Sequence, residues 1–205
     1  MKDADIVSIS DTDLWQKFKN GEDAAFGLIF HTHYKAIFNY GLKFNSNSEL
    51  VEDCIQELFL ELWKNKNSIS QIDNIKPYLL KSIRRKIIKQ SNKNSKLRKL
   101  FNNVLPKEYE FEVIFSPEYQ LIHSQISEEK VKKLQTMLDS LPPRQKEVLY
   151  LLFYQDMSYE EISQIMSMNY QSARNLVHRA IKLLRDNSLL DTLIIYFIFL
   201  KNFPS

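Results

Sequence analysis

Hydrogen-bonding and basic side chains gather on one predicted helix face near the C-terminal end of the chain. At about 3.6 residues per turn, this face lies opposite a seam of small and apolar residues, Ala173, Val177, Ala180 and Leu184. The polar face comprises Gln171, Arg174, Asn175, His178, Lys182 and Arg185. A helix in the major groove needs such groups to reach base edges and phosphates. The face therefore suits DNA binding, and a solvated helix surface is the alternative.

The segment before this helix favours DNA binding over a solvated helix surface. Ser158 and Glu161 have the spacing of a capping box, which predicts a short helix that runs through Met166. A turn at 167–169 then leads into the longer helix. A short helix, a tight turn and a longer helix are the proportions of a helix-turn-helix.

A second candidate for nucleic-acid contact is a basic helix in the middle of the chain. From Lys76 to Lys99 the sequence contains ten Lys or Arg residues and no Asp or Glu. Its cations suit a phosphate backbone, and Tyr78 offers a ring on which an unpaired base can stack. The alternative for Tyr78 is a buried ring with its hydroxyl at the surface.

An acidic face is predicted on the helix between Glu49 and Lys64. Apolar residues share one side of this helix, namely Val51, Ile55, Leu58 and Leu62. The other side collects Glu49, Asp53, Gln56, Glu57 and Leu60. A polar face interrupted by one exposed apolar group suits an interface with a basic partner helix, and an ordinary solvated face is the alternative.

Catalytic, metal and cofactor sites are not predicted. His31 and His33 are two residues apart and so point in different directions on a helix, and there is no glycine-rich phosphate loop. Cys54 is the only cysteine, which excludes an internal disulfide and indicates a reduced, buried thiol. The acidic N-terminus does not resemble a signal peptide, so we expect a cytoplasmic protein.

Composition and patterning predict an all-α protein of two small helical domains joined by a flexible linker. The 205 residues are 44% hydrophobic and 26% charged, include three glycines, and carry a net charge of +3. We expect a first domain over 10–92, a linker over 93–125, a helix-turn-helix domain over 126–186 and an apolar tail over 187–205. The apolar run from Leu193 to Leu200 is far shorter than the roughly 20 residues of a membrane span. It packs on the last domain or contacts a partner or membrane surface.

Motifs in the two predicted domains, taken in their order along the chain, resemble a known family. The segment from Asp53 to Trp63 resembles the polymerase-binding helix in the second conserved region of bacterial sigma factors. The segments 141–148, 157–162 and 177–180 resemble the fourth region of the same family. Because we expect no N-terminal inhibitory region and no third domain, the chain is similar to the extracytoplasmic-function (ECF) group. The resemblance implies a non-enzymatic subunit whose partners are core RNA polymerase and promoter DNA, with no small-molecule substrate.

The resemblance also implies residue roles. Contact with a coiled coil of the largest polymerase subunit is implied for Asp53, Gln56, Glu57 and Leu60. Opening and reading of the −10 element is implied for the basic helix, at Tyr78, Lys81, Arg84, Arg85 and Lys89. Recognition of the −35 element is implied for Gln171, Ser172, Arg174, Asn175, His178 and Lys182. The linker, including the acidic and aromatic stretch 108–112, is implied to thread through the polymerase cleft.

Some positions depart from the family pattern. Arg85 stands where asparagine is usual and Lys89 replaces a common acid, so −10 base preference does not transfer. Ser163 and Ser167 replace a common alanine and glycine in the helix-turn-helix. One rival hypothesis is a free-standing helix-turn-helix regulator, which has no use for the acidic face. Another is a regulator that binds a sigma antagonist, which does not need the basic helix. The sequence leaves open whether an anti-sigma factor binds the chain.

Overall fold

The computed structural model describes residues 9–102, 109–113, 128–192 and 194, and its long elements are all helices. In chain order these are α1 (Asp11–Lys19), α2 (Asp23–Leu42), α3 (Ser48–Asn65), α4 (Ile75–Asn102), α6 (Glu128–Ser140), α7 (Pro143–Leu149), the π-helical turn η1 (Tyr150–Tyr154), α8 (Tyr159–Ile165) and α9 (Tyr170–Asp186). No strand occurs in the described ranges.

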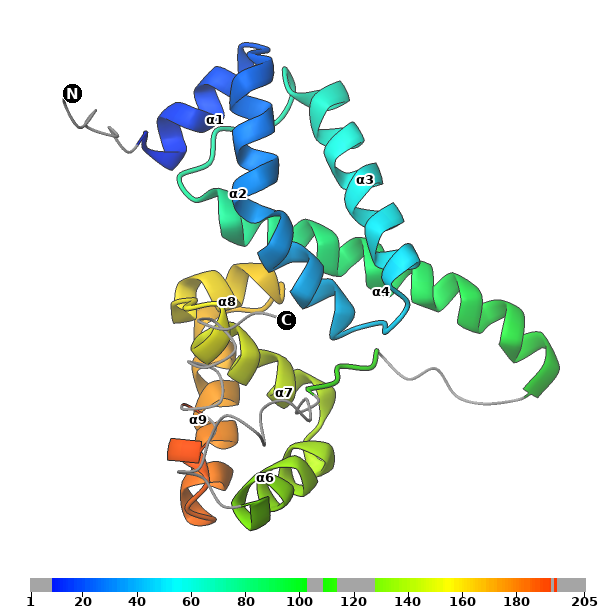
Figure 1. Ribbon diagram of the computed structural model, residues 1–205, viewed down its shortest axis with the longest axis vertical. Coiled ribbons are helices and arrows are strands. Elements are labelled where there is room, and N and C mark those ends of the chain that lie inside the picture. The colour runs from blue at the N-terminus through cyan, green and yellow to red at the C-terminus, as the bar shows by residue number, and fades with distance from the viewer. Residues whose placement is uncertain (1–8, 103–108, 114–127, 193, 195–205) are drawn as a thin grey trace.

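The helices form two bundles, one above the other in Figure 1. In the first bundle α2 packs against α1, α3 and α4. In the second, α9 packs against α7 and α8. Helix α8 also rests against α4, which joins the two bundles. The predicted all-α class, with two helical domains and a helix-turn-helix in the second, is confirmed.

The residues at the helix ends explain where several helices start and stop. The Ser10 side chain accepts a hydrogen bond from the backbone N–H of Asp13 and caps α1. The chain leaves α1 through Gly21, whose φ of 87° lies in the left-handed region that glycine adopts without strain. Pro143 occupies the first turn of α7, where its missing N–H costs nothing.

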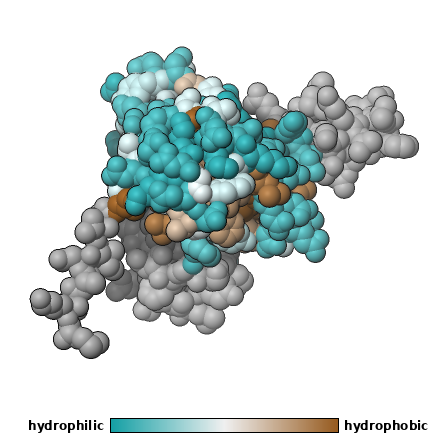
Figure 2. Space-filling view, turned by 90° about the horizontal axis from the view of Figure 1, so that it is seen from above, coloured by the Kyte–Doolittle hydropathy of each residue, from teal (hydrophilic) through white to brown (hydrophobic). Residues whose placement is uncertain are grey.

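Helix α3 is amphipathic as its period predicts. Its predicted apolar side is buried in the first bundle, at Val51, Ile55, Leu58 and Leu62. Cys54 and Phe59 are buried beside them. The side toward solvent is hydrophilic apart from Leu60, and Figure 2, seen from above, shows a mostly hydrophilic surface.

Helix α2 approaches its neighbours closely at Gly41. A β-carbon there would lie 2.6 Å from Cγ1 of Val51 and 3.0 Å from Cδ1 of Ile87. Both side chains are buried, and a β-branched residue has few alternative rotamers. We expect Gly41→Ala to lower the free energy of unfolding by about 1–3 kcal/mol through overpacking, measured by urea denaturation. Gly27→Ala is the matched control on the same helix, because no atom lies within 4 Å of its added carbon. Equal unfolding midpoints for the two variants would contradict this packing.

Two observations in the predicted linker were not anticipated. Helix α4 runs to Asn102, beyond residue 92 where we expected the first domain to end. Residues 109–113 lie against both bundles: the backbone N–H of Glu112 donates to the Lys43 carbonyl, and Gln135 of α6 donates to the Val113 carbonyl. This part of the linker is thus packed in place, although the linker boundaries themselves remain a prediction.

The π-helical turn shifts the buried side of the segment after α7. A regular α-helical period would bury one side of this segment at Val148, Leu149, Leu152 and Phe153. The first two are buried, whereas the last two are half-buried. The turn, closed by the bond from the Gln155 N–H to the Tyr150 carbonyl, widens the helix by one residue. Tyr150 and Leu151 therefore point inward instead.

The helix-turn-helix forms as its sequence predicts. Ser158 and Glu161 make both hydrogen bonds of a capping box at the start of α8. The turn passes through Ser167, whose φ of 53° is left-handed, which explains why glycine suits this position in the family. The seam of α9 predicted from Ala173 to Leu184 is fully buried.

Only the beginning of the C-terminal tail lies among the described residues. Leu189 and Thr192 are buried, and the backbone N–H of Leu189 donates to the Leu184 carbonyl at the end of α9. The rest of the tail, 193 and 195–205, lies outside the described residues, including most of the apolar run. None of the described helices is long and apolar enough to cross a membrane.

Candidate nucleic-acid and protein interfaces

The polar face of α9 is available to a ligand. All six side chains predicted for −35 recognition are exposed: Gln171, Ser172, Arg174, Asn175, His178 and Lys182. Asn169 caps the start of the helix, because its side chain accepts a hydrogen bond of 2.7 Å from the Ser172 N–H. The buried seam packs α9 on α7 and α8, so the second bundle fixes the direction of the polar face.

The charges of α9 have one sign until its last residue. From Tyr170 to Arg185 the helix contains no Asp or Glu. Arg179, which sequence analysis did not single out, is also exposed, and its Nε donates to the Asn175 carbonyl at 3.3 Å. Its position on the edge of the polar face was the signal that could have identified it. A basic helix face of this length suits contact with a polyanion.

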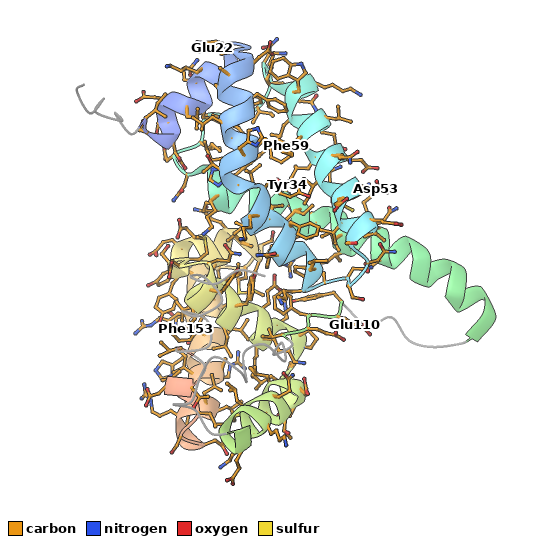
Figure 3. The ribbon with its side chains drawn as sticks, in the orientation of Figure 1. Glu22, Tyr34, Asp53, Phe59, Glu110 and Phe153 are labelled. Carbon is orange, nitrogen blue, oxygen red and sulfur yellow. The ribbon has the colours of Figure 1, made fainter. Side chains whose placement is uncertain are left out.

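A different surface is exposed on α3. The predicted polymerase contacts Asp53, Gln56, Glu57 and Leu60 are all exposed, and Leu60 is 59% exposed despite its apolar side chain. Figure 3 shows Asp53 on the side of α3 that faces away from α2. We call these four residues the α3 surface. An exposed leucine surrounded by acidic and amide side chains is compatible with an interface to a basic partner helix.

The acidic charge of α3 is partly balanced within the bundle. Lys86 of α4 lies 3.4 Å from Glu57 and 2.6 Å from Glu61, measured from its Nζ to the carboxylate oxygens. These carboxylates are exposed, so the ion pairs contribute little stability. The α3 surface can therefore change its charge without loss of the fold.

The predicted −10 residues on α4 do not form one exposed face. Lys89 is exposed, and Lys81 is half-buried. The ring of Tyr78 is half-buried and meets the ring of Trp15 edge-on, with centroids 5.3 Å apart. Arg85 is exposed and its Nη2 donates to Ser167 Oγ at 3.4 Å. Arg84, expected to contact DNA, is only 9% exposed and faces the second bundle.

The partner of Arg84 is Glu147 of α7, which is completely buried. Arg84 donates from Nε to Oε1 of Glu147 at 2.7 Å and from Nη2 to Oε2 at 3.2 Å. Tyr40 donates to Oε1 at 2.5 Å, and the hydroxyl of Tyr109 donates to Oε2. The carboxylate thus accepts four hydrogen bonds, which satisfies its lone pairs in the absence of water.

The ionisation of this cluster follows from its burial and its charges. Burial and the Glu147 carboxylate both raise the pKa of Tyr40 and that of Tyr109, so both hydroxyls stay protonated as donors. Burial lowers the pKa of Arg84, but the adjacent carboxylate outweighs it and the net shift is upward. Arg84 therefore stays charged beside Glu147.

The remaining candidates for chemistry stay apart. His31 is exposed whereas His33 is buried, as expected for residues two apart on α2. Among the described residues, no three His, Cys, Asp or Glu side chains come together as metal ligands would.

Comparison with known proteins decides the family. Residues 29–97 match the family model for sigma-70 region 2, and residues 132–184 match that for sigma-70 region 4. Together the two matches cover more than half of the chain. Over 153 residues the chain is 22% identical to the ECF RNA polymerase sigma factor SigM of Bacillus subtilis (strain 168), a match that covers 74% of this chain and 88% of SigM. The chain belongs to the ECF sigma factors.

The chain is also similar to a second curated relative and, in fold, to two solved structures. The chain is 24% identical to the RNA polymerase sigma factor SigV of the same strain, over 75% of this chain and 84% of SigV. Its fold is similar to the sigma factor RpoE of Bartonella quintana, solved with the anti-sigma factor NepR, with a TM-score of 0.57, 19% identity, and coverage of 78% of this chain and 94% of RpoE. Its fold is also similar to CnrH, solved with the cytosolic domain of CnrY, with a TM-score of 0.55 and 18% identity. This match covers 89% of this chain and 97% of CnrH.

Proposed function

We propose that this sigma factor binds core RNA polymerase through the α3 surface and directs it to promoters by reading the −35 element with α9 and the −10 element with α4. The observation that carries the proposal is the presence, in one chain, of an exposed acidic surface with a central leucine and an exposed basic recognition helix. A protein that binds DNA alone needs only the second of these.

The two surfaces have different proposed partners, polymerase for the α3 surface and promoter DNA for the α9 face. The α3 surface offers carboxylates and an apolar anchor to a basic partner, which suits the family's polymerase contact. The α9 face offers amide and guanidinium groups, which make bidentate hydrogen bonds to adenine and guanine in the major groove. Catalysis stays with the polymerase in this proposal, and the chain acts where the polymerase acts, in the cytoplasm.

An anti-sigma factor is the third proposed partner. The sequence leaves such a partner open, and the similar RpoE of Bartonella quintana was solved with the anti-sigma factor NepR. Because that likeness is one of fold, the proposal goes no further than the class of partner.

The direct test is assembly. Purified chain and bacterial core polymerase are mixed and separated by size-exclusion chromatography, alone and with duplex promoter DNA. We expect the chain to elute with the polymerase in both cases. Stable binding of the free chain to duplex DNA, with no polymerase association, would instead indicate a free-standing regulator.

A further inference from the structure

Helix α1 holds the part of the chain that leads into α4. The side chain of Trp15 is completely buried, and its Nε1 donates to the Ser70 carbonyl at 3.1 Å. The Gln71 amide donates to the Thr12 carbonyl, also at 3.1 Å. In Figure 1 the chain leaves the end of α3 and passes by α1 before it enters α4. One turn of α1 therefore supports the residues that precede α4.

The first residue of α1 also fixes where α4 begins. Oδ2 of Asp11 accepts a hydrogen bond of 2.8 Å from the backbone N–H of Ile75, the first residue of α4. The first N–H groups of a helix have no partner within the helix, and the helix dipole favours a carboxylate beside them. Ile75 is completely buried, so its N–H needs a partner from the protein. Asp11 supplies this partner from a different helix.

The same helix also contacts Tyr78, the aromatic residue among the proposed −10 contacts. The ring of Trp15 meets the ring of Tyr78 edge-on, with centroids 5.3 Å apart, and lies 5.0 Å from the ring of Phe18. Tyr78 is half-buried, so part of its ring is packed and part is open to solvent. Burial raises the pKa of Tyr78, so the ring stays neutral and suits stacking on a base.

We propose that α1 is a positioning element for −10 recognition, in which Asp11, Thr12 and Trp15 hold the segment from Ser70 to Tyr78 so that the Tyr78 ring can stack on an unpaired base. We call Asp11, Thr12 and Trp15 the α1 brace. The proposal rests on the proposed function, because it takes the −10 role of α4 from there. The brace residues are positioning residues, because they act on DNA only through Tyr78.

The stretch before α4 depends on support from outside itself. From Ser70 to Asn74 the chain forms neither helix nor strand, and most of these residues are exposed. The brace holds this stretch at its start, at Ser70, and just beyond its end, at Ile75. Asn74 also donates to Glu161 of α8. The brace is therefore the support that comes from the first bundle itself.

The polar atoms of the brace have no part in the packing of α1. The buried residues of this helix are Leu14, Trp15 and Phe18, which pack it in the first bundle. Apolar packing alone would need neither a carboxylate at Asp11 nor an N–H on the ring of Trp15. Both groups are instead directed at backbone atoms of the chain that enters α4.

Two variants test the brace, each with a matched control. Trp15→Phe keeps a buried ring and loses the N–H that binds Ser70. Its control is Trp63→Phe, because Trp63 belongs to the same group of rings through Phe18 and Phe26 but lies on α3, outside the segment from Ser70 to Tyr78.

The second variant, Asp11→Ala, removes the acceptor for the Ile75 N–H and changes no residue of the buried core. It decides the question if Trp15→Phe does not fold. Asp23→Ala is its control, because it removes the same charge from an exposed site in the first turn of α2.

The first readout is amide hydrogen exchange in the free full-length chain. We expect both brace variants to exchange faster within residues 70–78, by about tenfold or more at the Ile75 amide, because a local support is lost. Exchange in the middle of α2 and α3 should match that of the parent chain. A general loss of stability would instead raise exchange throughout the first bundle.

The second readout uses the complex of core polymerase with the full chain, titrated with single-stranded DNA of mixed sequence that carries 2-aminopurine. Stacking quenches the fluorescence of this base, so the quenching at saturation reports the position of the ring and not the affinity. Base stacking on an aromatic ring is worth about 5–150-fold in affinity, and Tyr78→Ala measures this full loss. We expect the brace variants to bind about fivefold more weakly and to quench less at saturation, while both controls match the parent.

The outcomes separate this inference from the function on which it rests. Brace variants that fold and match the parent in DNA affinity and in quenching would overturn the inference, whether or not exchange rises. A parent complex that binds no single-stranded DNA would overturn the proposed −10 role of α4, and the positioning role with it. Assembly with polymerase is measured for every variant, and equal assembly shows that a loss in DNA binding arises at the −10 contact.

Discussion

Leu60→Asp should reduce the affinity of this sigma factor for core RNA polymerase by about 30-fold, because truncating or charging an apolar anchor at the centre of an interface costs about 2 kcal/mol or more. Leu60 is exposed and does not belong to the buried core of the first bundle. The change should therefore leave the unfolding transition of the free chain where it was.

Leu28→Asp provides a matched control for this measurement. Leu28 of α2 is also an exposed leucine, and it lies outside the α3 surface. Titration of labelled sigma factor with core polymerase gives the dissociation constant of each variant. Equal losses for the two leucines, or no loss at position 60, would contradict the assignment of the α3 surface.

The acids around Leu60 should act mainly on the rate of association. The double change Asp53→Asn and Glu57→Gln removes exposed charge, and Lys86 keeps Glu61 as its partner. Charges at the rim of an interface accelerate the encounter of the two partners, and salt screens this attraction. The variant should thus bind more slowly at low salt and approach the parent rate as salt rises.

Arg174→Ala should remove most of the dependence on the −35 sequence, with a cost of about 1–3 kcal/mol, or about 5–150-fold, at promoters that carry the preferred base. Arg174 is exposed on the polar face of α9, so its removal leaves the packed seam intact. Promoters with a scrambled −35 element should lose little, since no base contact is made there to begin with.

Lys182→Ala separates base reading from phosphate contact. Lys182 lies two turns beyond Arg174 toward the end of α9, where we expect phosphate contact. Its loss should weaken all promoters alike and reduce the salt dependence of binding. Transcription from matched promoter pairs measures both effects, and a uniform loss for Arg174→Ala as well would refute its role in base readout.

Local features of this fold were predictable because they depend on neighbours in sequence. The buried seam of α9 and the apolar side of α3 follow from a 3.6-residue period, and the Ser158 capping box follows from a three-residue spacing. The segments that resemble the second and fourth regions of sigma factors then predicted which type of domain each half of the chain forms. Helix period also predicted which side chains of α3 and α9 would be exposed.

The junction between the bundles was not predictable on these grounds. Glutamate is usually found at the protein surface, so the sequence gives no reason to expect Glu147 in the interior. No sequence spacing relates it to Tyr40 or Arg84, which lie 107 and 63 residues away. The basic run on α4 predicted a helix that offers its cations to nucleic acid. Tertiary contacts divide these cations, because Arg84 is buried and Lys89 is exposed. Phe111 was expected in a linker and instead belongs to the buried core.

Initiation from a library of genomic promoters, by core polymerase with and without this chain, tests the central claim most directly. We predict new transcripts only when the chain is present, with a shared sequence near −35 and another near −10 upstream of their start sites. The same transcripts with and without the chain, although the polymerase is active and the chain is added in excess over it, would contradict the proposed function.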